Sequence, residues 1–324
     1  MPACRTFRRR DMRTSHPHRL RLLALVTLTL LLGAPSAAHA REPRPRLAWP
    51  PAGEAAVEVQ GIGRLSVHRS SQPVPIASVA KVMTAYLTLR RDPLRHGEDG
   101  FVLTVTAADV EDEQRRAALG QSVLPVRAGE HLSERQALQA LMLPSANNVA
   151  QILAAREAPT VDAFVRRMNV TARELGMSAT TYTDPSGYSA STVSTAADQL
   201  RLAAVAMRRS AFARIVNRPS AVLPIAGVVS NYNQLVGHDG YVGIKTGSDA
   251  AAGGCLIFAK RVLIGGHRLM ILGDVLDQRE GSYIPAALTA GRRLGDSAAA
   301  ALRNGVLITA GTAAFVGRRL ARLL

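Results

Sequence analysis

The chain has 324 residues, 47% of them apolar, and a formal net charge of +16. This length accommodates one large domain or two smaller ones, and the two cysteines, Cys4 and Cys255, exclude a fold held together by several disulfides. The arginines are scattered and aromatic residues make up 4% of the chain, so we predict no nucleic-acid partner. Attraction to an anionic cell envelope explains the basic charge equally well.

Residues 1–40 have the pattern of an export signal. Seven arginines precede a short apolar run, residues 22–32, and a small-residue cleavage site follows at 38–40. The run is too short for a transmembrane helix, which needs about 20 residues. We therefore expect cleavage after Ala40, export to the periplasm or the exterior, and association with the cell envelope. An uncleaved anchor is the alternative.

The chain after the signal is predicted to open with a flexible lead-in and a pair of strands. Residues 41–54 are rich in Pro and Arg, a composition typical of flexible segments. Apolar residues between 55 and 67 predict strands near a hairpin, and a helix with few breakers follows over 77–89. Residues 101–126 mix strand-like and polar pieces.

Several helices are predicted in the middle of the chain. Ser133 to Gln136 form a capping-box pattern ahead of a helix that has to end before Pro144, because proline disfavours helical geometry in the residue before it. Thr195 is the expected N-cap of a later helix. The predicted helices cover residues 137–142, 148–156, 161–175 and 195–207.

Strands are predicted again toward the C-terminus. An antiparallel meander is indicated by three short apolar runs, residues 241–246, 254–259 and 268–275. A last helix is expected over 284–302. Together these elements predict an α+β domain, residues 55–303, in which an antiparallel sheet built from both chain ends is flanked by helices and carries a helical insert. For residues 304–324, a basic tail that contacts a membrane peripherally and a strand or frayed end are the alternatives.

The positive charges of this chain are almost all arginines. Only three lysines, Lys81, Lys245 and Lys260, stand against thirty-seven arginines. An ammonium group can lose its proton when it is buried, whereas a guanidinium group in a protein effectively cannot. A lysine is therefore the residue to expect where a base is needed.

Ser78 and Lys81 form a candidate nucleophile and base. They lie one turn apart at the start of the predicted helix 77–89, so their side chains share one face. The positive end of the helix dipole favours the negative charge that develops during attack. A neutral Lys81 can then take the hydroxyl proton of Ser78. By itself this short pattern is also explained by an N-cap serine and a solvated lysine.

Two later triplets favour the catalytic interpretation. Ser-Ala-Asn at 145–147 follows a proline-terminated helix, where the Ser145 hydroxyl can relay a proton and the Asn147 amide can pair with a substrate amide. Lys-Thr-Gly at 245–247 ends a predicted strand, where the ammonium can bind a carboxylate and the glycine lets a peptide approach closely. The three patterns occur in this order, 67 and 100 residues apart.

With these motifs the chain resembles the active-site serine penicillin-binding proteins, and more closely their low-molecular-mass D-alanyl-D-alanine carboxypeptidases. The resemblance covers about residues 55–290. It rests on residues 77–85, 143–148 and 243–248 for the three motifs, and on residues 184–187 and 231–233. It implies a β-lactamase/transpeptidase-like fold.

The resemblance also implies a role for the residues of the first two motifs. Ser78 corresponds to the acylated nucleophile and Lys81 to its base. Ser145 would relay a proton to the leaving group, and Asn147 would hold the substrate amide.

The third motif is implied to bind the end of the substrate. Lys245 and Thr246 would bind the terminal carboxylate, in the same substrate-binding strand as Gly247 and Ser248. The backbone N–H groups of Ser78 and Ser248 would form the oxyanion hole. The implied activity is removal of the terminal D-Ala from peptidoglycan stem peptides, with β-lactams as inhibitors and with neither a cofactor nor a metal.

Three positions depart from the family pattern. Ala80 stands where threonine is usual, Asn148 where aspartate is frequent, and Asp249 where threonine is common. A carboxylate at 249 would oppose a substrate carboxylate by like-charge repulsion.

Two other functions are compatible with the same fold. A serine β-lactamase commonly needs a glutamate followed three residues later by Leu and Asn, and no acid between Asn147 and Lys245 has that context. A non-catalytic penicillin-binding sensor or scaffold would bind wall peptides without turning them over.

Overall fold

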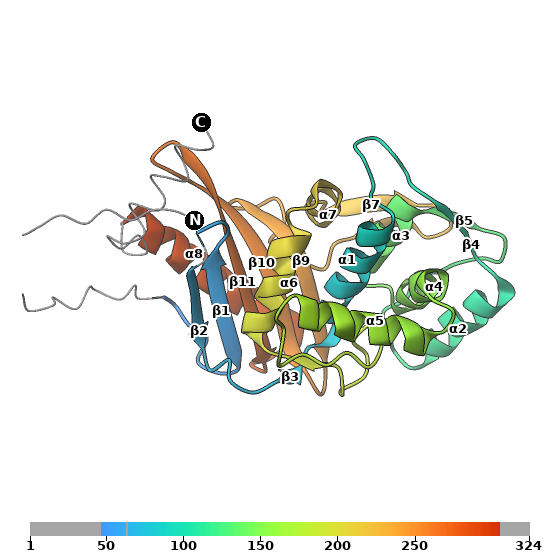
Figure 1. Ribbon diagram of the computed structural model, residues 1–324, viewed down its shortest axis with the longest axis horizontal. Helices are drawn as coiled ribbons and strands as arrows, with labels where there is room; N and C mark the ends of the chain where they lie inside the picture. The colour runs from blue at the N-terminus through green and yellow to red at the C-terminus, as the bar shows by residue number, and fades with distance from the viewer. Residues whose placement is uncertain (1–46, 63, 305–324) are drawn as a thin grey trace, which may run out of the picture. The chain divides into compact units, whose positions relative to one another are not determined.

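The computed structural model describes residues 47–62 and 64–304 (Figure 1). The predicted export signal and the tail after residue 304 lie outside the described residues. Within the described part, no helix combines the length and the apolar character that crossing a membrane requires.

A five-stranded antiparallel sheet joins the two ends of the described chain. Its strands lie in the order β2-β1-β11-β10-β9, and β1 pairs with β11 with Val57 opposite Gly273. The strand bounds are Glu54–Val59 (β1), Arg64–His68 (β2), Tyr241–Asp249 (β9), Gly253–Ile264 (β10) and His267–Gln278 (β11). The predicted sheet from both chain ends and its C-terminal meander are confirmed.

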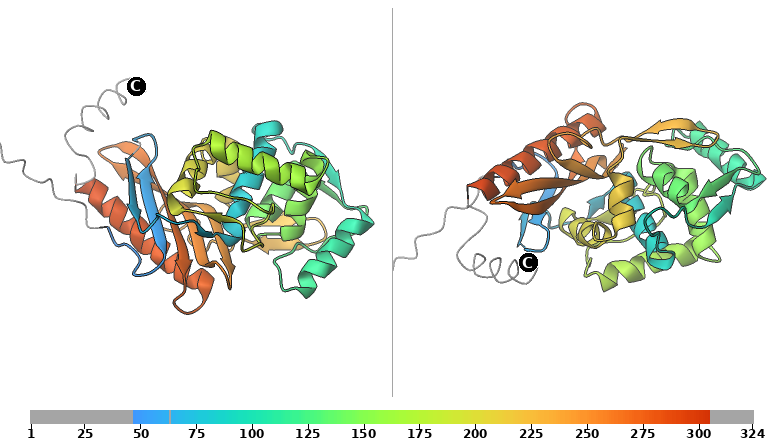
Figure 2. Two further views of the ribbon diagram at one scale, coloured as in Figure 1. Left: turned by 60° about the horizontal axis from the view of Figure 1, so that its bottom comes forward. Right: turned by 90° about the horizontal axis from the view of Figure 1, so that it is seen from above.

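Both faces of the sheet are covered, which explains the continuous apolar runs in its strands. Side chains alternate between the faces of a strand, and in β11 Ile271 and Val275 pack in one hydrophobic cluster with α8, Tyr283–Arg303. Leu272 and Leu276 belong to the cluster of the helical region on the other face. Figure 2 shows α8 along one face of the sheet. Cys255 is fully buried in β10, in agreement with a core position.

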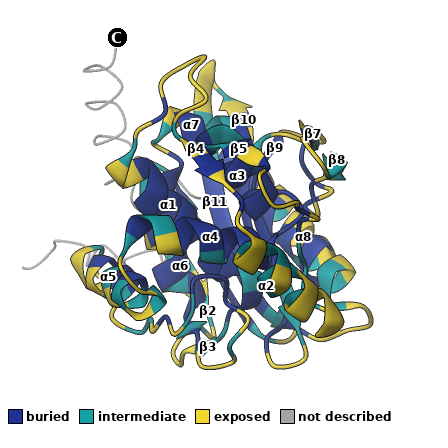
Figure 3. Cartoon of the chain, turned by 90° about the vertical axis from the view of Figure 1, so that its right-hand side faces the viewer, coloured by how far each residue is buried: buried dark blue, intermediate teal, exposed yellow. Residues whose placement is uncertain are grey.

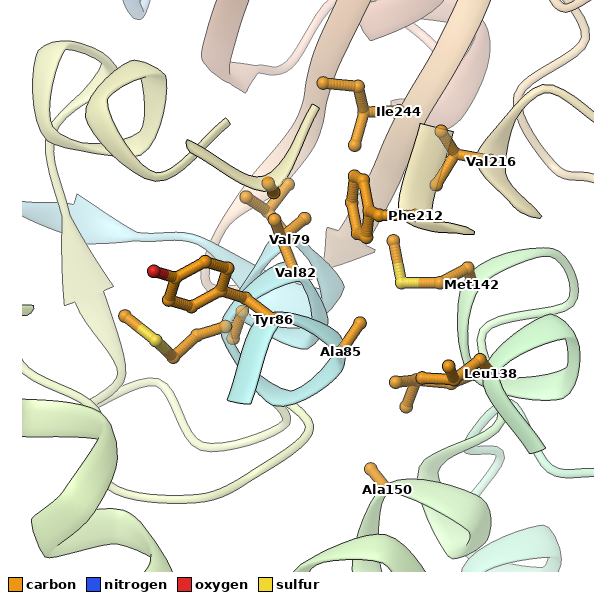
Figure 4. Packing of buried hydrophobic residues seen from close by; sticks show 14 of the residues in the cluster. Val79, Val82, Ala85, Tyr86, Leu138, Met142, Ala150, Phe212, Val216 and Ile244 are labelled. Atoms are coloured by element: carbon orange, nitrogen blue, oxygen red, sulfur yellow. The ribbon is translucent and has the colours of Figure 1, made fainter. Parts of the chain in front are cut away.

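The helical region is organised around α1. Val82, Ala85 and Tyr86 of this helix pack among side chains from α3, α4, α7 and β9, which Figure 4 shows from close by. Figure 3 shows that α1 and α4 are largely buried and that α2 is not. The bounds are Ala77–Ala80 (η1, a 3-10 turn), Lys81–Arg91 (α1), Ala107–Ala118 (α2), Glu134–Met142 (α3), Asn147–Glu157 (α4), Val161–Glu174 (α5), Ala196–Ala206 (α6) and Ser210–Val216 (α7).

The helix caps follow the sequence signals. Ser133 and Gln136 form both bonds of the predicted capping box at α3, and Thr195 caps α6 as predicted by accepting from the N–H of Asp198. Three short strand pairs complete the described structure: Val74–Pro75 (β3) with Val193–Ser194 (β6), Val102–Thr104 (β4) with His131–Ser133 (β5), and Ser220–Leu223 (β7) with Gly227–Ser230 (β8).

The structure corrects the predicted flexible lead-in, residues 41–54, for residues 47–54 only, since residues 41–46 lie outside the described residues. The ring of Trp49 stacks on His68 with centroids 5.4 Å apart, and the N–H of Ala48 donates to Ser297 Oγ at 2.9 Å. Glu54 already belongs to β1. The described residues 47–54 are therefore packed on the domain, because the Pro-rich composition that indicated flexibility also contains a large aromatic ring.

Asp274 is a fully buried carboxyl group in the middle of the sheet. It lies in β11 opposite Ala56 and Ile257. Neither of its oxygens has a well-formed hydrogen bond within the described part of the chain. Burial, and after it the neighbouring Glu54, holds the pKa of Asp274 well above its ordinary value. The protonated acid is therefore the form that the fold accommodates best.

We expect Asp274→Ala to raise the free energy of unfolding at pH 8 by about 1–3 kcal/mol, because it removes a poorly partnered buried carboxyl group. A raised native pKa makes the parent most stable below the unfolded-state pKa of about 3.9, and stability is lost as pH rises through the native pKa. The gain should therefore shrink toward pH 4. Denaturant unfolding at both pH values measures the effect, and a variant less stable than the parent at pH 8 would contradict it.

Candidate active site

Ser78 and Lys81 are in direct contact. Ser78 is half-buried in the 3-10 turn η1, and Lys81, the first residue of α1, is fully buried. The Lys81 Nζ atom lies 2.7 Å from Ser78 Oγ and 2.8 Å from the carbonyl oxygen of Ser186. Residues three apart eclipse each other in a 3-10 turn, so this turn places the amine over the hydroxyl. The predicted helix over 77–89 thus begins with a tighter turn.

The surroundings of Lys81 favour its neutral form. Burial is the largest cause that lowers the pKa of Lys81 well below its ordinary value, followed by the charges of Lys245 and Arg116, while Asp184 opposes the shift. Burial also lowers the pKa of Lys245 to about 7. The Lys245 Nζ atom donates to the carbonyl oxygen of Thr246 at 3.0 Å. Burial and the neighbouring cations thus favour the unprotonated amine, which is the form that can accept a proton from Ser78.

Asp184 holds the turn that presents the Ser186 carbonyl to Lys81. Its Oδ1 atom accepts from the Ser186 N–H and hydroxyl at 2.7 and 2.6 Å and from the Gly187 N–H at 2.7 Å. Its Oδ2 atom accepts from the Ser189 N–H and from the Thr192 hydroxyl, each at 3.0 Å. Burial alone would raise the pKa of Asp184, but these hydrogen bonds outweigh burial and lower it.

Gly247 and Gly187 allow two segments to approach the nucleophile turn. A Cβ atom on Gly247 would lie 2.9 Å from the Ser78 nitrogen and 3.0 Å from the Val79 nitrogen. A Cβ atom on Gly187, which has φ +79, would lie 1.9 Å from the carbonyl oxygen of Ala77. Only glycine fits at either position. The sequence pattern predicts that Gly247 lets a peptide approach closely. The structure adds a second reason for this glycine, which is the packing of β9 against η1.

The second motif lies where predicted, on the link between α3 and α4. Both of these helices pack against α1. Ser145 is buried with φ +67, a left-handed conformation that costs energy for a residue with a side chain. Its Oγ atom has no hydrogen-bond partner among the described residues. Asn147 is also buried, and its Nδ2 atom donates to Gln121 Oε1 at 2.8 Å.

Lys260, the third lysine, is buried away from these motifs. Its Nζ atom donates to the Asp239 carbonyl oxygen at 2.7 Å and to Asp296 Oδ1 at 2.8 Å. It also lies 4.1 Å from the centroid of the Tyr241 ring, a cation–π contact. All three lysines are therefore buried, and this one has a structural role.

Comparisons with known proteins agree with this geometry. The model of the peptidase S11 family, D-alanyl-D-alanine carboxypeptidase, matches residues 60–272. The chain belongs to this family. It is 36% identical over 191 residues to a D-alanyl-D-alanine endopeptidase of Pseudomonas aeruginosa, covering 57% of this chain and 58% of the relative. It is 32% identical over 204 residues to a D-alanyl-D-alanine carboxypeptidase of Mycobacterium tuberculosis, covering 61% and 65%.

The chain thus spans less than two thirds of the length of these curated relatives. Among solved structures, it is similar to the Streptomyces K15 DD-transpeptidase, with a TM-score of 0.68 and 24% identity over 79% of this chain and 98% of that one. This likeness confirms the predicted α+β, transpeptidase-like fold.

The structure shows the surroundings of the three residues that depart from the S11 pattern. Ala80 is fully buried, and a Cβ atom on Gly187 would lie 2.8 Å from its Cβ. Asn148 donates to the Leu124 carbonyl oxygen and accepts from the Leu124 N–H, both at 2.9 Å. The Oδ1 atom of Asp249 accepts from the Ala252 N–H at 2.7 Å in the turn between β9 and β10. The predicted repulsion between Asp249 and a substrate carboxylate stays a prediction.

Three site residues were not predicted to act: Asp184, Arg116 and Gln121. Asp184 lies in a segment that matched the subgroup, so its position was indicated but its role was not. Arg116 and Gln121 come from α2 and the loop after it, where the sequence pattern predicted no element. Gln121 accepts a hydrogen bond from Asn147, which is distant in sequence, and Arg116 in turn contacts Gln121.

Proposed function

We propose that the protein is a serine D-alanyl-D-alanine carboxypeptidase that removes the terminal D-Ala from peptidoglycan stem peptides. The observation that carries this proposal is the buried Lys81 amine, 2.7 Å from Ser78 Oγ, in a member of the S11 family. Penicillin should acylate the same serine. Ser78→Ala is the direct test, since a variant that still reacts covalently with a fluorescent penicillin would refute the assignment.

In the proposed acylation step, Ser78 Oγ attacks the carbonyl carbon of the penultimate D-Ala while its proton passes to Lys81. The backbone N–H groups of Ser78 and Ser248 stabilise the oxyanion. The peptide C–N bond then breaks, and Ser145 relays a proton to the amine of the departing D-Ala. Water hydrolyses the resulting Ser78 ester, which releases the shortened peptide and restores the hydroxyl.

The proposed binding groups belong to the second and third motifs. Lys245 and Thr246 bind the terminal carboxylate in the strand that also contains Gly247 and Ser248, and Asn147 pairs with a substrate amide. The burial of Lys245 supports the first assignment, because a desolvated ammonium gains from a carboxylate partner. The buried, unpartnered Oδ1 of Asn147 supports the second.

The pH dependence of kcat/KM for a stem pentapeptide should be bell-shaped. The acid limb reports Lys81, which has to lose its proton to act as base, and its lowered pKa moves this limb toward lower pH. The alkaline limb should fall near the Lys245 pKa of about 7, because an uncharged Lys245 no longer attracts the carboxylate.

Lys245→Arg is the matched control for this pH profile. The guanidinium stays charged, so the alkaline limb should move to higher pH while the acid limb, set by Lys81, remains. An alkaline limb that is unchanged in Lys245→Arg would contradict the role given to Lys245.

Endopeptidase cleavage of cross-linked stem peptides is a second candidate function. It is favoured by the relative that is named a D-alanyl-D-alanine endopeptidase, at 36% identity. The chemistry at Ser78 is the same, and only the leaving amine differs. Comparing the purified protein on a monomeric pentapeptide and on a cross-linked dimer decides which substrate it prefers.

The location of the protein follows from its proposed substrate. Peptidoglycan lies outside the cytoplasm, so the proposal requires export, which the pattern of residues 1–40 supports. Peripheral membrane contact through residues 304–324 is a further part of this proposal, supported by the basic end of that segment. Cell fractionation with an antibody against the protein tests both statements.

A further inference from the structure

The carboxamide of Asn147 is held in one orientation. Asn147 is the first residue of α4 and only 5% exposed. Its Nδ2 atom donates to Gln121 Oε1 at 2.8 Å, whereas its Oδ1 atom is buried and has no hydrogen-bond partner within the described part of the chain. A flip of the amide would exchange an acceptor for a donor at the buried position. A neighbouring group therefore has to determine whether the oxygen or the nitrogen of the Asn147 amide occupies this buried position.

Arg116 fixes this orientation through Gln121. Its Nη1 atom donates to Gln121 Oε1 at 3.2 Å, and its Nε atom donates to Asp112 Oδ2 at 2.5 Å. A guanidinium group can only donate hydrogen bonds, so it selects the oxygen end of the Gln121 amide. That oxygen in turn accepts only a donor, the Nδ2 group of Asn147. Arg116 thus determines the orientation of the Gln121 amide, and Gln121 in turn determines the orientation of the Asn147 amide.

The loop that contains Gln121 is hydrogen-bonded to the start of α4, the helix that begins with Asn147. The N–H of Asn147 donates to the Ser122 carbonyl oxygen at 2.8 Å. Asn148 pairs with both backbone groups of Leu124 at 2.9 Å. These three bonds hold the segment 121–124 against the start of α4, so Gln121 meets Asn147 at a fixed distance. Asn148, which departs from the family pattern, is part of this attachment.

We infer that Gln121, oriented by Arg116, is a positioning residue for substrate binding: it fixes the Asn147 amide so that Oδ1 is presented as an acceptor to an N–H group of the stem peptide. This inference rests on the proposed function for the identity of the ligand. The orientation of Asn147 itself is a property of the free protein and can be measured without turnover.

Gln121→Met and Gln121→Glu separate orientation from simple packing. Methionine has a similar length but accepts no comparable hydrogen bond, so kcat/KM for the pentapeptide should fall about tenfold, mainly through KM. Glutamate keeps acceptor oxygens for both Arg116 and Asn147, so its kcat/KM should stay within about threefold of the parent. Gln121→Met with parent kinetics, or Gln121→Glu as impaired as Gln121→Met, would overturn the inference.

Arg116→Met provides a coupled test. It should raise KM as Gln121→Met does, and the double variant should be no worse than either single variant, because both act through one path. Additive losses would contradict that path. The comparison is made on the pH plateau, since the Arg116 charge also acts on Lys81. Thr160→Ala, which removes the N-cap of α5, controls for a loss of stability of about 1 kcal/mol without a change in KM.

The side-chain amide resonances of Asn147 in ¹⁵N-labelled protein provide a readout that is independent of activity. In the parent and in Gln121→Glu, its Nδ2 protons should exchange slowly with solvent, and in Gln121→Met they should exchange faster. If the parent shows this protection but releases no D-Ala, the proposed function fails and the orientation of Asn147 stands. If the parent is active and Gln121→Met leaves exchange and KM unchanged, the inference fails and the proposed function stands.

Discussion

Replacing Lys81 with arginine is expected to slow acylation of Ser78 by a factor of about 10²–10⁴, even though the positive charge is kept. The amine of Lys81 is fully buried beside Lys245, which favours its neutral form, whereas a guanidinium cannot be deprotonated there. The measurement is the rate of covalent reaction with a fluorescent penicillin. An arginine variant that reacts at nearly the parent rate would refute the role of Lys81 as base.

Two further variants test whether slow acylation in Lys81→Arg has another cause, such as misfolding or a general effect of placing arginine at a buried lysine. Lys81→Met has a similar length and no charge, so it should be as slow as Lys81→Arg while remaining folded by thermal denaturation. Lys260→Arg makes the same exchange at another buried lysine, whose contacts with Asp239 and Asp296 a guanidinium can also make. It should react with penicillin at the parent rate. A slow Lys260→Arg would show that buried lysine-to-arginine exchanges are harmful in general.

Asp184→Ala should cause the second large loss, in stability and activity together. The side chain accepts hydrogen bonds from the backbone and side chains of the turn over residues 184–192. Without them, the free energy of unfolding should fall by about 3–5 kcal/mol, in the range of a broken buried network. The Ser186 carbonyl would no longer be held beside Lys81 Nζ, so acylation should also slow.

The pH dependence of stability distinguishes the charge of Asp184 from its shape. Because hydrogen bonds lower its native pKa, its contribution is present above the unfolded-state pKa of about 3.9 and is lost as pH falls through the native pKa. Asp184→Asn keeps one acceptor oxygen and does not titrate, so its stability should change less between pH 6 and pH 3 than that of the parent. Urea unfolding at the two pH values is the measurement. An equal change in both proteins would mean that Asp184 is not the group responsible.

The elements that could be predicted from the sequence are those whose own residues are buried in a regular pattern. The apolar runs of β9, β10 and β11 and the capping signals at Ser133 and Thr195 lie within a few residues of the structure they form. The helix α2 was not predicted, since it has no buried residue and is formed around the capping box of Thr106 and Asp109. The short helix α7 was missed as well.

The candidate site shows the same division. Ser78, Lys81 and the two later motifs could be found because each motif consists of residues that are close together in the sequence. The dependence of Asn147 on Gln121 could not be found, because it joins a loop to a helix 26 residues away through a single side-chain contact. The steric reason for Gly247 likewise depends on how β9 packs on η1, which no local pattern contains.

The most direct test of this account is release of D-alanine from a purified stem pentapeptide by the protein, with Ser78→Ala as the control. The account predicts steady release that is absent from the variant. Penicillin labelling of Ser78 without release of D-alanine would favour a sensor or scaffold, and rapid hydrolysis of penicillin would favour a β-lactamase. Release that persists in Ser78→Ala would contradict the central claim that this serine is the nucleophile.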